Sequence, residues 1–307
     1  MRGMTMLRDP SSPWRCLLVL LVAVLAFAMG GAHAGTQASG AAALRTRFAA
    51  TQPLLADSPF GGPLLLESTE APRLLQGDVY ALVDHPFAAV SASLGNPERW
   101  CDVMILHLNT KYCRRAVENG VPQIELRVGK KHDQPIAAAA PVAFGFRAVS
   151  TTPEYLAVEL QAPQGPFDTR DYRILFEAVP LDGGRSFIHM GYSFGYGAVS
   201  RMAMQVYLAT IARDKVGFTK VAAARPGEAP GYIGGVRGLV ERNTMRYYLA
   251  IDAYLGALAV PPAEQTERRL RAWFDATERY SRQLHEVERE AYMSMKRREI
   301  ARQQQAQ

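Results

Sequence analysis

The sequence predicts an α+β fold in which one curved antiparallel sheet grips a long C-terminal helix, with a further charged helix behind it. Polar and apolar residues alternate through the middle of the chain, tight-turn residues separate these stretches, and an amphipathic helix follows. Short consecutive strands joined by tight turns pair antiparallel, whereas parallel strands need crossover helices. With 307 residues and 48% hydrophobic residues, the chain can bury a sizeable core.

The first 34 residues are expected to be a secretory signal peptide. Arginines precede an apolar run, Leu17 to Met29, that is too short to span a bilayer comfortably, and Ala32-His33-Ala34 fits a cleavage site. Cleavage near Ala34 would deliver the protein to the bacterial periplasm, and an uncleaved membrane anchor is the alternative. Residues 35–61 are rich in Ala, Gly and Thr and are expected to form a flexible N-terminal arm.

Export to an oxidising compartment would favour a disulfide between the remaining cysteines. Cys16 would leave with the signal peptide, so Cys101 and Cys113 remain as an even pair in an oxidising compartment. A disulfide between them would contribute about 3 kcal/mol by restricting the unfolded chain. Two buried free thiols are the alternative.

The main domain is expected to span 62–260 and to open with two strands, Pro63–Glu70 and Leu74–Asp84. Two short helices follow, over 86–94 and 97–104, separated by the helix-breaking Gly95-Asn96-Pro97. The remaining strands are predicted at Ile105–Cys113, Gln123–Gly129, Val142–Val149, Tyr155–Ala162, Asp171–Val179 and Arg185–Phe194.

Three helices are predicted after the strands. Val199–Phe218 is apolar, Val236–Leu258 has an apolar stripe at three- and four-residue steps, and Thr266–Ala301 is laced with charges. The segment 261–307 is therefore expected to be a solvated helix that the core does not need, so truncation at Pro261 would leave a folded domain. Binding to an envelope membrane or a transporter partner is the alternative role of this segment.

The order of these elements resembles the START-like and polyketide-cyclase superfamily, whose fold is the helix-grip. The resemblance covers about 62–258 and is most specific at Gly77–Cys113, where Asn96-Pro97-Glu98-Arg99-Trp100 is similar to a turn common in these proteins. The helix Val199–Phe218 and the tail after Leu258 depart from the pattern. The resemblance implies an apolar cavity, because a curved sheet around one helix cannot fill its own interior.

The ligand expected in this cavity is a lipid or another hydrophobic small molecule. The candidate ligand-binding residues are Phe144, Phe146, Tyr172, His189, Asn243, Thr244, Tyr247 and Tyr254. A ligand head group is one candidate partner for Asn243, and a strand carbonyl is the other. A tryptophan at position 244 is expected to enter empty space without loss of stability. His189 can equally be an ordinary core or surface histidine. His107 would lie on one strand face with Lys111, toward either solvent or ligand.

The sequence gives little support for a serine hydrolase, a dinucleotide site, a metal site or a nucleic-acid-binding role. Gly191-Tyr192-Ser193-Phe194-Gly195 fits the Gly-x-Ser-x-Gly motif, but a nucleophile elbow needs a mostly parallel sheet, so no catalytic residue is assigned. The glycine-rich Gly231–Gly238 follows a loop, which does not support a dinucleotide site. The histidines show no metal-ligand spacing, so no metal or cofactor is expected. Basic and acidic residues interleave at a net charge of +6, and no nucleic acid is expected as a partner.

The leading hypothesis is a periplasmic carrier without enzymatic activity. One alternative is a cyclase- or hydratase-type enzyme on the same fold, which would place titratable groups with shifted pKa values in the cavity. The other is an envelope interaction protein with a filled core. The fold does not choose among them.

Overall fold

The computed structural model describes residues 40–210, 213–222 and 230–305, so the expected signal peptide lies outside the described residues. The chain divides into two units, 1–43 and 44–307, and the second contains the sheet. The strands of this sheet are β1 (Leu64–Ala71), β2 (Leu74–Val83), β3 (Thr110–Glu118), β4 (Val121–Val128), β5 (Ala140–Thr152), β6 (Tyr155–Gln164), β7 (Thr169–Leu181) and β8 (Arg185–Tyr196). A separate pair consists of β9 (Lys220–Val221) and β10 (Gly231–Tyr232).

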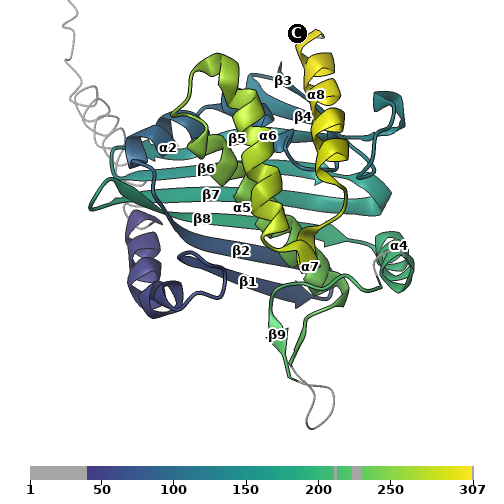
Figure 1. Ribbon diagram of the computed structural model, residues 1–307, viewed down its shortest axis with the longest axis horizontal. Helices are drawn as coiled ribbons and strands as arrows, with labels where there is room; N and C mark the ends of the chain where they lie inside the picture. Colours follow the sequence, from purple (N-terminus) through teal and green to yellow (C-terminus); the bar gives the residue numbers. More distant parts are fainter. Residues whose placement is uncertain (1–39, 211–212, 223–229, 306–307) are drawn as a thin grey trace, which may run out of the picture. The chain divides into compact units, whose positions relative to one another are not determined.

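Helices surround this sheet at its ends and on one face (Figure 1). They are α2 (Phe87–Leu94), α3 (Trp100–Met104), α4 (Ala198–Ala209), α5 (Gly235–Gly256), α6 (Pro262–Glu278), α7 (Ser281–Leu284) and α8 (Arg289–Gln305). Three short 3-10 turns are η1 (Pro97–Arg99), η2 (Ile136–Ala138) and η3 (Pro166–Asp168). None of the helices among the described residues is long and apolar enough to cross a membrane.

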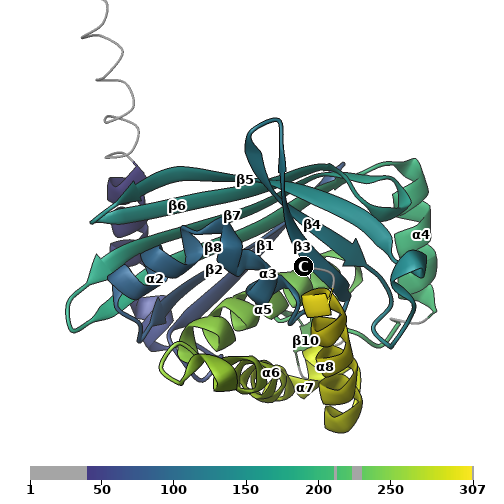
Figure 2. The ribbon, with the colours of Figure 1, turned by 90° about the horizontal axis from the view of Figure 1, so that it is seen from above.

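The predicted fold class is confirmed. The eight strands are all paired antiparallel in the order β1-β2-β8-β7-β6-β5-β4-β3. Strands β3 to β8 follow one another as a meander, with short turns between most neighbours and the longer segment 129–139 between β4 and β5. Figure 2 shows the sheet curving over α5 and α6, which lie on the same side of it.

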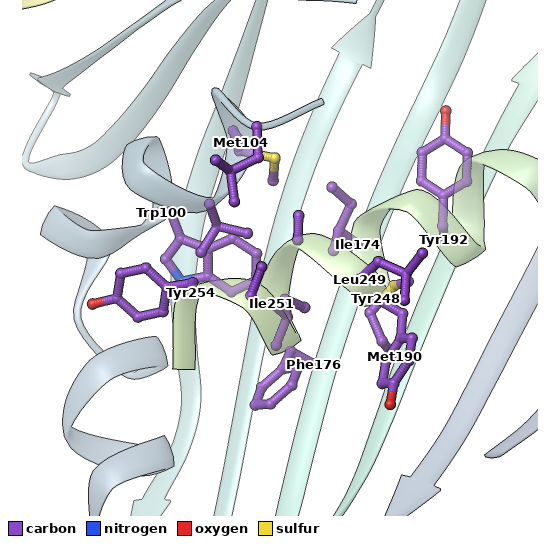
Figure 3. Close-up of a cluster of buried hydrophobic side chains, with 14 of the residues drawn as sticks. Trp100, Met104, Ile174, Phe176, Met190, Tyr192, Tyr248, Leu249, Ile251 and Tyr254 are labelled. Atoms are coloured by element: carbon purple, nitrogen blue, oxygen red, sulfur yellow. The ribbon is translucent and has the colours of Figure 1, made fainter. Parts of the chain in front are cut away.

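Helix α5 packs closely on the sheet because β2 has a glycine where the two meet. A Cβ atom added to Gly77 would lie 2.2 Å from the Oγ1 of Thr244. The Thr244 hydroxyl donates to the carbonyl of Val240 at 2.8 Å, within the helix. Position 244 is therefore closely packed, and the expectation that a tryptophan there enters empty space is wrong. Figure 3 shows the core along α5, where Phe176 of β7 lies by Ile251 and Met190 of β8 lies by Leu249.

The tail is not the single solvated helix that its charges suggest. It forms α6, α7 and α8, and the chain turns at 285–288 before α8 begins. Trp273 of α6 and Tyr292 of α8 are buried and stack at 5.0 Å between ring centroids. The Tyr292 hydroxyl donates to the carbonyl of Leu106 at 3.0 Å. Since both helices bury aromatic side chains against the domain, the tail completes the core.

Buried charges also join α8 to β3. Glu299 accepts hydrogen bonds from Lys111 at 3.2 Å and from Lys296 at 2.8 Å, and none of the three side chains is exposed. Lys296 also donates to the carbonyls of His107 and Thr110, each at 2.7 Å. A charge this deeply buried is stable only when it is paired and hydrogen-bonded, so α8 and the 105–110 segment depend on each other.

Three further expectations are corrected or confirmed. Residues 40–56 are helical rather than a flexible arm, because Leu44 and Leu55 are buried and the ring of Phe48 lies 4.9 Å from that of Phe187. The strand expected from Ile105 begins only at Thr110, since 105–109 forms a turn. The disulfide between Cys101 and Cys113 is confirmed, with 5.4 Å between their Cα atoms. The turn at 105–109 brings the two cysteines together.

Candidate functional site

An aromatic cluster lies between the concave face of the sheet and α5. Its rings come from three strands, from α5 and from the 105–109 turn: Phe144, Tyr172, Tyr192, Phe194, Tyr247 and His107. Successive ring centroids lie 4.9 Å apart for His107 and Tyr247, 5.2 Å for Tyr192 and Tyr247, and 5.3 Å for Tyr172 and Phe194. Side chains alternate between the faces of a strand, so even-numbered residues of β8 such as Tyr192 point into this cluster.

His107 places an unpaired donor in the cluster. Its Nδ1 accepts the backbone N–H of Asn109 at 3.1 Å, so the neutral ring carries its proton on Nε2. That Nε2 is buried and has no hydrogen-bond partner among the described residues. Burial lowers the pKa of His107 well below its usual range, and the charges of Arg246 and Lys296 lower it further. The imidazole is therefore neutral at pH 7.

Two tyrosine hydroxyls also lack a protein partner in the described part of the chain, but unlike the Nε2 of His107 they are not completely buried. Tyr192 and Tyr247 make ring contacts on both sides, but neither hydroxyl has a hydrogen bond to any of the residues that the structure describes. Burial raises the pKa of both phenols, so they stay protonated. By contrast, the hydroxyl of Tyr172 donates to Thr169 at 2.9 Å. The cluster thus contains three neutral donors available to an acceptor, at His107, Tyr192 and Tyr247.

Several of the predicted site residues belong to this cluster or lie beside it. Phe144, Tyr172 and Tyr247 are members, and Phe146 follows Phe144 on the same face of β5. Asn243 is half-buried on α5, one helical turn before Tyr247 and on the same side of the helix. These residues can therefore contact one ligand.

Two other predicted residues of α5 have different surroundings. Thr244 packs against Gly77 of β2, whose cross-strand neighbour is Tyr192 of the cluster, so it lies at the edge of the cluster. Tyr254 lies near Trp100, at the end of α5 away from Tyr192 (Figure 3). The guanidinium of Arg269 covers the Tyr254 ring, 4.6 Å from the centroid. Tyr254 is therefore separate from the aromatic cluster.

His189 lies on the opposite, convex face of the sheet because it is an odd-numbered residue of β8. Its Nδ1 is 2.7 Å from Glu177 and its Nε2 is 2.9 Å from Asp78, while the ring stacks on Tyr80 at 4.4 Å. Burial alone would lower the pKa of His189, but the hydrogen bonds to the two carboxylates outweigh burial and raise it. His189 therefore cannot contact a ligand at the aromatic cluster, and its role is to bridge the carboxylates of Glu177 and Asp78.

Two members of the cluster, Tyr192 and Phe194, are absent from the sequence prediction, which leaves open whether His107 faces solvent or ligand. Tyr192 and Phe194 alternate in phase with Met190, so the period of two contains the signal that would identify them. His107 had no such signal, because it lies in a turn that resembles a strand. No group of three or more His, Cys, Asp or Glu side chains in the described ranges is placed to hold a metal ion.

No protein-family model matches the chain, and no curated protein matches it. Three solved structures are similar to parts of it. A norcoclaurine synthase point mutant from Thalictrum flavum, in complex with a transition-state analogue, is 12% identical over 47% of this chain and 93% of its own, with a TM-score of 0.33. The Zhui aromatase/cyclase from Streptomyces sp. R1128 is 13% identical over 68% of this chain and 95% of its own, with a TM-score of 0.30.

The third is a protein from Arthrobacter aurescens, solved by NMR in solution. It is 12% identical over 60% of this chain and 87% of its own, with a TM-score of 0.33. Similarities of this size carry no argument about function, so membership of the START-like superfamily stays a prediction.

Proposed function

We propose that the protein binds a hydrophobic small molecule or lipid at the aromatic cluster, and that it carries this ligand in the bacterial periplasm. The observation behind the proposal is the set of three unpaired donors on His107, Tyr192 and Tyr247. The Nε2 of His107 is completely buried, and because buried polar groups nearly always have hydrogen-bond partners, a ligand oxygen would give it one. Apolar walls with a few convergent polar groups are typical of small-molecule sites.

The protonation states of the cluster favour binding over catalysis. A general acid or base works best with a pKa near the working pH. Burial moves the pKa of His107 down and those of Tyr192 and Tyr247 up, so all three stay neutral donors throughout the physiological range. Such a lining suits an uncharged acceptor, for example a carbonyl or hydroxyl oxygen. A carrier therefore fits better than a cyclase or hydratase.

The first experiment identifies the ligand. The protein is purified from the periplasm of a bacterium that expresses the full chain, and its organic extract is analysed by mass spectrometry. We expect one class of apolar molecule that contains an oxygen acceptor, and an N-terminus at Gly35. An extract without any such molecule would contradict the binding role, and protein retained in the cytoplasm would contradict the periplasmic role.

A second experiment tests the site. The double variant Tyr192→Phe, Tyr247→Phe keeps both rings and removes both hydroxyls. A hydrogen bond contributes about 1 kcal/mol net, so the affinity for the extracted ligand should fall by about tenfold or more. Tyr254→Phe on the same helix is the matched control and should bind like wild type. Equal affinity of the double variant and the control would exclude this site.

A further inference from the structure

Helix α4 is apolar on two sides, and one of them faces away from the domain. Met204 packs against the core, as is usual for a surface helix. Met202 and Val206, four residues apart on one face, are 68% and 59% exposed. Figure 1 shows α4 at one end of the sheet, apart from α6 and α8. The outward face of α4 is therefore without apolar cover from the described part of the domain.

The turn η3, beside α4, presents an exposed aromatic ring. Phe167 is 78% exposed and has a φ of 57°, a left-handed conformation that is uncommon for a bulky residue. Asp168 follows with a φ of 61°, and its carbonyl accepts the Ser200 hydroxyl of α4 at 3.4 Å. Strained backbone held in place by its neighbours is concentrated at functional positions. Here the strain holds an apolar ring toward solvent in a turn that contacts α4.

Three arginines lie among these apolar side chains. Arg73, Arg170 and Arg201 line a surface hollow of about 540 Å³ together with Met202 and Asp168. Arg73 is exposed and has no ion pair among the described residues. Arg170 lies 3.6 Å from the exposed Asp171, and Arg201 donates to a backbone carbonyl. The planar guanidinium group binds phosphate oxygens in pairs and is weakly hydrated, which suits contact with phosphate head groups.

We propose that α4 and η3 form a docking surface for an anionic phospholipid bilayer. Phe167, Met202 and Val206 enter the boundary between head groups and acyl chains, while Arg73 and Arg201 contact phosphates. Exposed apolar side chains on two elements, with arginines near them, suit the surface of an anionic bilayer. There the burial of apolar side chains and the attraction between arginines and lipid phosphates both contribute to the binding free energy.

The position of this surface links it to the aromatic cluster. Strand β8 runs from Tyr192 and Phe194 directly into α4, and Tyr172 lies three residues after the start of β7, which follows η3. This inference rests on the proposed function, because a protein that carries a hydrophobic ligand has to collect it from a bilayer or deliver it to one. Its test needs no ligand.

The test measures flotation of the purified full chain with vesicles of phosphatidylcholine alone or mixed with phosphatidylglycerol. Wild type should float with the mixed vesicles, less so as salt is added. The variant Phe167→Asn, Met202→Gln, Val206→Gln should lose binding by about tenfold or more. Asparagine tolerates the left-handed backbone and the other two positions are exposed, so the fold should persist. The variant Arg73→Gln, Arg201→Gln should lose only the gain from phosphatidylglycerol.

The control is Val117→Gln, which removes an equally exposed apolar side chain (73%) from β3 and should float like wild type. Flotation of the triple variant at the wild-type level, or no flotation of wild type with either vesicle, would overturn the docking surface. The same variants are also titrated with the fluorescent probe N-phenyl-1-naphthylamine. Loss of flotation with unchanged probe binding supports docking as a separate property. Flotation without any probe binding would refute the proposed function and leave the docking surface intact.

Discussion

Replacing Glu299 by glutamine should destabilise the protein far more than its position in a charged tail suggests. The carboxylate is the shared partner of Lys111 and Lys296, and all three side chains are completely buried. Removing one member of a buried ion pair typically costs about 3–5 kcal/mol, because the remaining charge stays in a low-dielectric site without a counter-ion. Two lysines remain here, so we expect a loss in this range at neutral pH.

The loss of stability caused by Glu299→Gln is also expected to change with pH in a definite direction. Burial lowers the pKa of Lys296 from 10.5 to about 8, and Glu299 opposes this shift. A lysine with a lowered pKa releases its proton in the folded state first, so the protein gains stability as pH rises from about 8 toward 10.5. Without the carboxylate the pKa of Lys296 falls further, and the gain begins at a lower pH. The difference between wild type and Glu299→Gln should therefore narrow as pH rises.

The assay is urea unfolding followed by the fluorescence of the buried Trp100 and Trp273, at several pH values. Glu290→Gln, an exposed position in the same helix, is the control and should stay within about 0.5 kcal/mol of wild type. A loss for Glu299→Gln no larger than that of the control, or a difference that does not change with pH, would refute the buried-charge explanation. Cooperative unfolding of a protein truncated at Pro261 at wild-type stability would show that α8 is dispensable after all.

Three further predictions concern the contact between the sheet and α5, the disulfide, and the buried His189. Gly77→Ala should cost about 1–3 kcal/mol in urea unfolding because its Cβ would collide with Thr244, and adding Thr244→Ala should restore most of this. The variant Cys101→Ser, Cys113→Ser should lose about 3 kcal/mol by the same assay, and unchanged stability would exclude a stabilising disulfide. Because its folded pKa is raised, His189 stabilises the protein fully below pH of about 6.5 and loses this effect as pH rises through the higher folded value. The gap in stability between wild type and His189→Gln should close over that interval, and a constant gap would contradict the raised pKa.

The sequence predicts the sheet well because the buried and exposed faces of a strand appear as an alternation of apolar and polar residues within a few positions. In β5, Val142, Phe144 and Phe146 alternate with polar or small residues, and the structure places all three on the concave face. The same reasoning fails in the 105–109 turn. There Ile105, Leu106 and Leu108 are all buried, and their run of apolar residues is indistinguishable from a strand.

The tail shows what local patterns cannot reveal. Lysine is almost never fully buried without a partner, so a helix rich in charges is read as solvated. Lys296 is buried because, besides the nearby Glu299, it has partners far away in the sequence, at the carbonyls of His107 and Thr110. The unpaired donor of His107 depends on the same long-range packing. The candidate site could therefore be predicted for its strand residues but not for its histidine.

The contacts around the aromatic cluster differ in strength, and this difference bears on where the proposed ligand would enter. On the β1 side, α5 is held by the buried Glu241, which accepts the Ser68 hydroxyl at 2.6 Å and two backbone N–H groups at 2.6 and 3.0 Å. At the 105–110 segment, α8 is held by Lys296. Opening either side would leave buried charges without partners, at a cost of several kcal/mol. The described side chains of α4 donate only to backbone carbonyls, from Ser200 and Arg201. Displacing α4, which carries the proposed docking surface, therefore breaks none of these buried ion pairs.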